Sequence, residues 1–265
     1  MIPKIIHYCW FGGKPKPKLA QKCMKSWARY CPDYRLMEWN EACFDVSAFP
    51  YAKQAYDAKK WAFVTDVVRL YALYHYGGIY MDTDVEVVRP LDRFLEHRAF
   101  SGFENETSIP TGIMAAEQGH PLIKKLLDSY ESRSFLIDGE PDLTTNVTTI
   151  TKLLSAEGFK ANNQLQEVAG ITLYPYDYFC PCDHKTMRLL RTENTYTIHH
   201  FAGSWLPEDY AELQRMRRRK SGIEARFGSH YADIYESVYY SLRKNGGEGL
   251  SRLIGNSLRR RIKKE

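Results

Sequence analysis

Apolar and polar residues alternate along residues 78–88, and this pattern predicts a strand with one face in a core. Residues two apart on a strand share a face. The apolar face consists of Ile79, Met81, Val85 and Val87. The other face consists of Tyr80, Asp82, Asp84 and Glu86. Three carboxylates on one face predict a cation site at this strand.

The strongest helical pattern, over residues 59–76, directly precedes this strand, and Gly77 is suited to cap it. Asp66 and Arg69 lie three residues apart on one side of the predicted helix. As an intrahelical ion pair they would contribute only about 0.2–0.5 kcal/mol. Alternatively, the pair contacts a polar substrate beside the acidic strand.

The remaining pattern repeats strand and helix, which is typical of an α/β fold with a mostly parallel sheet. Residues 5–11 predict a buried first strand, 18–30 a helix and 34–39 a second strand. Further strands are expected at 99–103, 112–116, 171–174 and 195–203, and further helices at 120–130 and 144–154.

Two regions of this fold offer candidate binding residues. Trp10 would lie at the carboxyl end of the first strand, where ligands collect in α/β sheets. Its ring would stack on a nucleobase or simply pack in the core. Between the strands at 99–103 and 112–116, Glu104, Asn105 and Thr111 would face an acceptor or be solvated.

The strand at 195–203 carries His199 and His200 near its end. The acidic strand lacks enough protein ligands to fill a metal shell. A neutral imidazole from a distant segment is a usual completion, so one of these histidines is a candidate ligand.

Charge separates a main domain, residues 1–206, from a basic helical extension, residues 207–265. From Arg215 onward the chain has fourteen Lys and Arg against five acidic residues, a net charge of about +9. The whole chain has a net charge of +5, so residues 1–214 carry about −4. Residues 250–264 repeat apolar residues at helical spacing, which predicts a helix, within residues 249–265, on an anionic membrane surface. A solvated basic face or RNA contact are the alternatives. We expect no nucleic-acid partner, because no RNA-binding signature accompanies the charge.

Six scattered cysteines without C-x-x-C pairs or a framework spacing indicate reduced thiols. The sequence shows neither a secretory leader nor a run long enough to span a membrane. We therefore expect a cytoplasmic protein, peripheral on the inner face of the membrane if its basic helix binds there.

Asp82 and Asp84 would lie about 6.7 Å apart on an extended strand, so that one holds an ion and the other a hydroxyl. Mn²⁺ or Mg²⁺ takes such oxygen ligands and is normally shared with a diphosphate. This chemistry is that of glycosyl transfer from a nucleotide sugar. The rival hypotheses are a haloacid-dehalogenase-like phosphotransferase that uses Asp82, and a non-enzymatic basic module that binds membrane or nucleic acid.

The sequence resembles the family 32 glycosyltransferases, which include capsular polysaccharide enzymes and yeast initiating mannosyltransferases with a D-x-D motif. More remotely it is similar to the clostridial glucosylating toxins. Four segments in the family's order carry the likeness: 2–13, 62–69, 77–84 and 199–205. The resemblance implies a GT-A-like nucleotide-binding fold and a retaining transferase that acts in surface polysaccharide synthesis. The donor would be a UDP-sugar or GDP-mannose, with UDP-sugars favoured, and the acceptor a glycan or lipid-linked glycan.

The resemblance also implies individual roles. Trp10 would stack on the base, and Asp66 with Arg69 would bind the donor sugar and diphosphate. Asp82 would contact ribose and sugar hydroxyls, and Asp84 would bind the metal. His200 would complete the metal shell, with His199 as the alternative. The residues expected to close over the diphosphate are Ser204 and Trp205.

Overall fold

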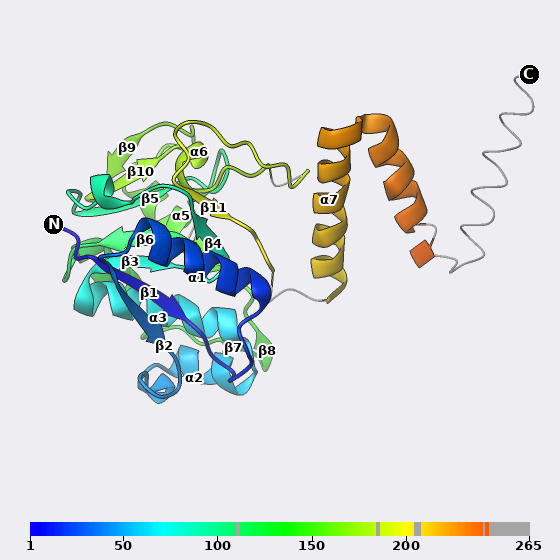
Figure 1. The fold of residues 1–265 in the computed structure, drawn as a ribbon. Helices are drawn as coiled ribbons and strands as arrows, with labels where there is room; N and C mark the ends of the chain where they lie inside the picture. Colours follow the sequence, from blue (N-terminus) through cyan, green and yellow to red (C-terminus); the bar gives the residue numbers. More distant parts are fainter. Residues whose placement is uncertain (110–111, 184–185, 204–207, 241, 244–265) are drawn as a thin grey trace, which may run out of the picture. The chain divides into compact units, whose positions relative to one another are not determined.

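A seven-stranded mixed sheet forms the centre of the fold in the computed structural model (Figure 1). The structure describes residues 1–109, 112–183, 186–203, 208–240 and 242–243. In sheet order the strands are β2 (Arg35–Trp39), β1 (Ile5–Cys9), β3 (Gly78–Met81), β6 (Ile113–Ala116), β5 (Ala99–Gly102), β10 (Ile171–Tyr174) and β9 (Gln166–Val168). Only β6 and β9 run against the other five. The expected α/β fold with a largely parallel sheet is confirmed.

The helices follow the sequence periodicity closely. They are α1 (Lys18–Tyr30), α2 (Pro50–Asp57), α3 (Trp61–Tyr76), α4 (Pro121–Asp128), α5 (Asn146–Ala156), α6 (Tyr176–Phe179) and α7 (Glu208–Phe227). Two 3₁₀ turns, η1 (Val46–Ala48) and η2 (Asp92–Phe94), and two short sheets are the other labelled elements, and residues 229–240 are also helical. The short sheets pair β4 (Val85–Val87) with β11 (Thr197–His199) and β7 (Leu136–Ile137) with β8 (Glu140–Pro141).

The sheet separates two apolar clusters, as the alternation of side chains requires. Tyr80 packs in the cluster that contains α2, α3 and α4 residues. Ile79, Met81, Val85 and Val87 pack in the other cluster, with Cys23 and Trp27 of α1. The predicted division of residues 79–87 into two faces is therefore confirmed for the apolar face.

Residues 78–88 do not form one continuous strand, so that expectation is wrong. β3 ends at Met81 and β4 begins at Val85, with the two aspartates in the turn between them. The backbone N–H of Val85 donates to the carbonyl of Asp82 at 3.0 Å, which closes the turn. β4 then leaves the central sheet to pair with β11.

The chain divides into two compact units, Met1–Cys182 with Leu190–Trp205, and Asp183–Leu189 with Leu206–Glu265. Within the second unit, Lys220 on α7 forms ion pairs with Asp233 and Glu236 at 3.2 and 2.5 Å. No helix among the described residues is long and apolar enough to cross a membrane. The predicted membrane-binding helix, residues 249–265, lies outside the described residues.

Candidate active site

The turn that carries the two aspartates is held by the glycines before β3. Gly77 and Gly78 have φ angles of 62° and 109°, which glycine adopts without strain. A Cβ atom on Gly78 would lie 2.8 Å from the carbonyl oxygen of Ile5 in β1. The main chain can therefore leave α3 and enter the sheet at once, which places the next turn at the end of β3.

Asp82, Asp84 and His199 converge at this turn. One ligand atom from each lies within 4.8 Å of the others. His199 is the last residue of β11 and pairs in register with Val85, so the β4–β11 sheet delivers the imidazole to the aspartates. The turn also brings the two carboxylates closer together than the extended strand would, and both can serve one ion.

The imidazole of His199 has closely packed neighbours. The ring of Phe201 stacks on it with centroids 4.0 Å apart. A Cβ atom on Gly112 would lie 2.9 Å from Nδ1 and Cε1, so only glycine leaves space for the imidazole there. The buried thiol of Cys180 also lies within hydrogen-bonding reach of the imidazole. These neighbours fix the position of the ring.

Electrostatics tie His199 to Asp84. Nε2 of His199 lies 3.4 Å from Oδ1 of Asp84, and the N–H of Ala202 donates to Oδ2 at 2.7 Å. Burial acts to raise the pKa of Asp84, but the His199 charge and these hydrogen bonds lower it well below its usual range. Burial likewise opposes the charged form of His199, and Asp84 raises its pKa well above the ordinary value.

The donor set fits a divalent cation. Two carboxylates and one imidazole suit Mn²⁺ or Mg²⁺, the imidazole favouring Mn²⁺, and their ligand atoms lie within 4.8 Å of one another. Asp82, Asp84 and His199 are the residues that would hold the ion. His199, which the sequence resemblance gives only as the alternative, is thus the histidine whose ring the structure brings to the two aspartates.

His200 lies beside the site with different partners. Its backbone N–H donates to the carbonyl of Asp84 at 3.0 Å, and its Nε2 lies 2.8 Å from Oε2 of Glu86. Glu86 also pairs with Lys22 at 2.7 Å. His200 therefore braces the turn through the main chain, and its imidazole is engaged by Glu86.

Arg69 contacts both predicted donor-binding segments, α3 through Asp66 and the aspartate turn through Asp82. Its Nη2 lies 3.3 Å from Oδ1 of Asp66 and 3.3 Å from Oδ1 of Asp82. The hydroxyl of Tyr80 donates to the same Asp82 oxygen at 2.8 Å, and the guanidinium lies 4.6 Å from the Tyr80 ring centroid. The structure thus brings together Asp66, Arg69 and Asp82.

Burial gives these groups unusual charge states. Burial first, and the nearby Asp82 charge second, raise the pKa of Asp66 to about 7, although Arg69 acts against them. Burial acts to lower the pKa of Arg69, but Asp82, Tyr80 and Asp66 raise it above its ordinary value. Arg69 therefore stays charged, while Asp66 can carry a proton and donate a hydrogen bond near neutral pH.

Two further buried polar residues, Asn146 and Tyr51, lie near Asp66, and neither belongs to a recognisable sequence motif. Asn146, at the start of α5, is 2% exposed, and its amide atoms make no hydrogen bond of ordinary geometry in the described part of the chain. Its side chain nevertheless lies within hydrogen-bonding reach of the Asp66 carboxyl and lowers the pKa of that carboxyl. The hydroxyl of Tyr51 on α2 is also buried and has no hydrogen-bond partner within the described ranges. Unsatisfied buried groups are rare, and here they lie around a predicted donor-binding carboxyl.

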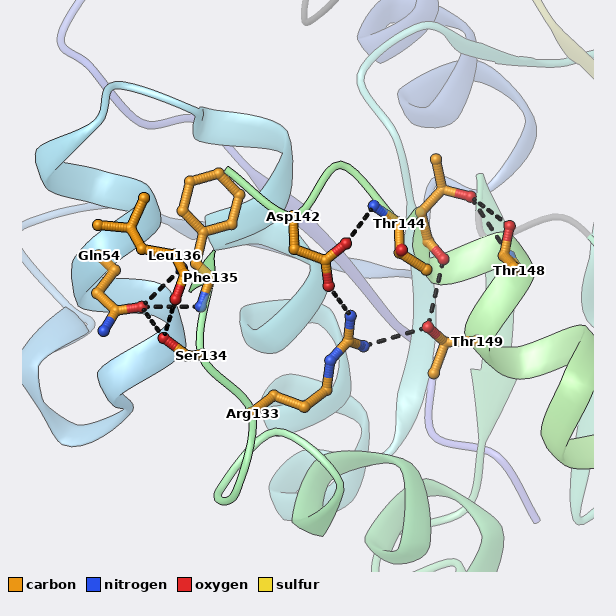
Figure 2. Close-up of polar contacts among 10 residues, drawn as sticks. Gln54, Arg133, Ser134, Phe135, Leu136, Asp142, Thr144, Thr148 and Thr149 are labelled. Atoms are coloured by element: carbon orange, nitrogen blue, oxygen red, sulfur yellow. Dashed lines mark hydrogen bonds and ion pairs between the residues drawn. The ribbon is translucent and has the colours of Figure 1, made fainter. Parts of the chain in front are cut away.

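A hydrogen-bond network fixes the segment that delivers Asn146 (Figure 2). Arg133 donates to Thr149 Oγ1 at 3.1 Å and pairs with Asp142 at 3.3 Å. Thr145 caps α5 by accepting from the N–H of Thr148. Gln54 Oε1 accepts from Ser134 and from the main chain of Phe135 and Leu136. The start of α5 is therefore anchored to α2.

The other predicted site residues have local partners or lie outside the description. Trp10 is half-buried, and its Nε1 donates to the carbonyl of Lys14 at 2.6 Å. Asn105 Oδ1 accepts from the N–H groups of Thr107 and Ser108, so its side chain shapes its own loop next to Glu104. Thr111, Ser204 and Trp205 lie outside the described residues.

Comparisons with known proteins match this region. Residues 17–101 match the family described as glycosyltransferase sugar-binding region containing DXD motif. The chain is 32% identical over 138 residues to inositol phosphoceramide mannosyltransferase 3 of Schizosaccharomyces pombe, covering 51% of this chain and 38% of that protein. It is 28% identical over 144 residues to mannosyl phosphorylinositol ceramide synthase CSH1 of Saccharomyces cerevisiae, covering 49% and 36%. The matches thus span less than two fifths of the length of either relative.

Solved glycosyltransferase structures are also similar. PaToxG glycosyltransferase has 20% identity and a TM-score of 0.45, covering 59% of this chain and 70% of that chain. Galactosyltransferase LgtC, in complex with donor and acceptor sugar analogs, has 12% identity and a TM-score of 0.40, covering 82% and 95%. The resemblance drawn from the sequence motifs is confirmed by the family match, which includes Asp66, Arg69, Asp82 and Asp84.

Proposed function

Because the chain carries the DXD-containing sugar-binding region of glycosyltransferases, we propose that it transfers a hexosyl group from a nucleoside diphosphate sugar to a hydroxyl. The supporting observation is the convergence of Asp82, Asp84 and His199 beside the buried Asp66–Arg69 pair. A divalent cation held by the three converging residues would neutralise charge on the departing diphosphate. The acceptor is a glycan or lipid-linked glycan.

The residues of this chain divide the work of binding the donor. Arg69 keeps a positive charge in a buried place, which suits a diphosphate oxygen or a sugar hydroxyl. Asp66, Asn146 and Tyr51 offer buried donors and acceptors to sugar hydroxyls. Preorganised polar groups of this kind stabilise developing charge without reorganising.

We propose retention of configuration, with the acceptor hydroxyl attacking on the side of the leaving group. In that case the sugar C1–O bond to the diphosphate breaks, the C1–O bond to the acceptor forms, and the acceptor proton passes to a diphosphate oxygen. The motivation is a site rich in diphosphate ligands and without an obvious nucleophile at the sugar. A glycosyl adduct trapped on a protein carboxylate would overturn this proposal.

The names of the two relatives bear on which nucleotide sugar is the donor. Both are named for mannosyl transfer to an inositol phosphoceramide or phosphorylinositol ceramide. The sequence resemblance favours UDP-sugars, but these names support GDP-mannose as the first donor to test. They also favour a lipid-linked acceptor that carries a phosphodiester.

The decisive test measures donor hydrolysis and thermal shift of the full chain with Mn²⁺ and a panel of GDP-mannose, UDP-glucose and UDP-galactose. A ligand bound only by the folded chain raises its melting temperature. Asp84→Asn keeps an acceptor for the Ala202 N–H but removes the charge, and it should abolish the Mn²⁺-dependent response. Asp33→Asn, at a side chain that is 78% exposed, is the control. Phosphatase turnover on a generic ester, with no response to any nucleotide sugar, would contradict the proposal.

A further inference from the structure

A groove whose lining has an excess of positive charge lies between α1 and β4. Figure 1 shows these two elements side by side. Its volume is about 330 Å³. Lys22, Lys25 and Arg29 line it from α1, and Arg191 lines it from the segment before β11. Glu86 is the single carboxylate among the lining residues, so the wall holds four cations and one anion.

The α1 cations share one face of the helix because they recur at spacings of three and four residues. Lys22 is already paired with Glu86 at 2.7 Å. Lys25, Arg29 and Arg191 form no ion pair within the described ranges and are exposed. Like charges gathered around a concavity repel one another and focus a positive potential in it. An anion in the groove would relieve that repulsion.

The groove adjoins the candidate active site through a chain of direct contacts. The N–H of His200 bonds the carbonyl of Asp84 at 3.0 Å, and its imidazole lies 2.8 Å from Glu86. Glu86 forms part of the groove wall, as do the next two residues, Val87 and Val88. An anion bound here would lie against the segment that follows Asp84 in the chain, outside the ligand set of Asp82, Asp84 and His199.

We propose that this groove binds the phosphate group of the acceptor, with Lys25, Arg29 and Arg191 as its ligands. The proposal rests on the proposed function, because it places an anionic acceptor next to the transfer site. A guanidinium group can donate two parallel hydrogen bonds to a phosphate, and a lysine adds a point charge. Two arginines and a lysine therefore suit a phosphate ester. The bound phosphate orients the acceptor so that a neighbouring hydroxyl reaches the donor.

The first experiment measures binding alone, by calorimetric titration of the full chain without donor or metal. The probes are inorganic phosphate, glycerophosphoinositol as a soluble phosphodiester, and vesicles of phosphatidylcholine with or without phosphatidylinositol. We expect the soluble phosphodiester to bind and the double variant Lys25→Glu/Arg29→Glu to weaken it by at least about tenfold. Binding only to inositide vesicles would assign the groove to a membrane surface and overturn the acceptor assignment. Binding of inorganic phosphate alone would overturn it as well.

Two matched variants separate the groove from general charge and folding effects. Lys152→Glu makes one of the same charge changes at an exposed position on α5 and should bind every probe as the unaltered chain does. Lys25→Arg/Arg29→Lys keeps both charges and should bind the phosphodiester within about threefold of the unaltered chain. Equal phosphodiester binding by the charge-reversed and unaltered chains would refute the proposal.

The second experiment compares transfer with donor hydrolysis in the same preparations. The charge-reversed variant should raise the KM for a phosphate-bearing acceptor by about tenfold relative to a neutral glycan acceptor. Failure of the proposed function would appear as no Mn²⁺-dependent donor hydrolysis by the unaltered chain. Failure of the groove assignment would appear as equal KM changes for both acceptors, so the two failures are distinguishable.

Discussion

Nε2 of His199 lies 3.4 Å from Oδ1 of Asp84, across the junction between β11 and the turn that follows β3. The contact joins residues 115 positions apart in sequence. Burial of both side chains makes the pair sensitive to the loss of either partner, since an unpaired buried charge is strongly unfavourable. The two residues therefore act as one unit in binding a cation.

Replacement of His199 by Ala should lower Mn²⁺ affinity by at least about 100-fold, because a ligand and the partner of Asp84 are lost together. Titration of Mn²⁺ followed by electron paramagnetic resonance measures the change directly. His200→Ala is the matched control. It keeps the main-chain bond to Asp84 and should change Mn²⁺ affinity by no more than about tenfold. The reverse order of effects would assign the metal to His200.

Gly112→Ala tests the space beside the His199 ring. The added methyl would lie 2.9 Å from Nδ1 and Cε1, so the imidazole must move. We expect Mn²⁺ affinity to fall about tenfold and the free energy of unfolding to fall by about 1–3 kcal/mol, as for overpacked cores. The control is Gly222→Ala, where a Cβ atom would meet nothing within 4 Å. Unchanged Mn²⁺ affinity in Gly112→Ala would show that the ring position is not required.

Asn146→Leu should separate stability from function. The amide makes no hydrogen bond of ordinary geometry within the described residues and reaches only the Asp66 carboxyl, so an apolar side chain of similar size should change the free energy of unfolding by no more than about 1 kcal/mol. The same change should weaken donor binding by at least about tenfold, because sugar hydroxyls lose their partner. Urea unfolding and donor thermal shift measure the two effects. A variant that keeps donor affinity would remove Asn146 from the donor site.

Most of the fold follows from residue periodicity. The helix at 59–76 and the first strand are nearly as the sequence predicts, because buried apolar stripes determine them. The break between β3 and β4 could not be predicted in this way. Alternation continues through residues 78–88, and only pairing with the distant β11 bends the chain at Asp82–Asp84. Non-local pairing of this kind leaves no local pattern.

The site was predictable where charge and glycine make a local signature. Asp66, Arg69, Asp82 and Asp84 are recognisable from their motifs, and the structure gathers them. The choice between His199 and His200 depends on the register of β11 against β4, which no single sequence reveals. Asn146 carries no signal either, because its importance lies in being buried beside Asp66, a property that only the packed structure defines.

The imidazole of His7 links β1 to the glycine turn and must be neutral to do so. Trp39 Nε1 donates to Nδ1 at 3.1 Å, so Nε2 carries the proton and donates to the carbonyl of Gly77 at 2.7 Å. Burial lowers the pKa of His7 from 6.5 to about 4, although the Gly77 bond acts to raise it. Protonation would place a donor opposite the Trp39 N–H and break this arrangement.

This shift predicts how stability depends on pH. Because the folded pKa lies below the unfolded pKa, the contribution of His7 is fully present above pH 6.5 and is lost as pH falls towards 4. The loss should approach roughly 3 kcal/mol. His7→Gln keeps a donor and an acceptor but does not titrate, so the difference between the two unfolding free energies should shrink as pH falls from 7 to 4. Urea unfolding at several pH values measures it. A difference that stays constant across this range would show that His7 is not held neutral by the fold.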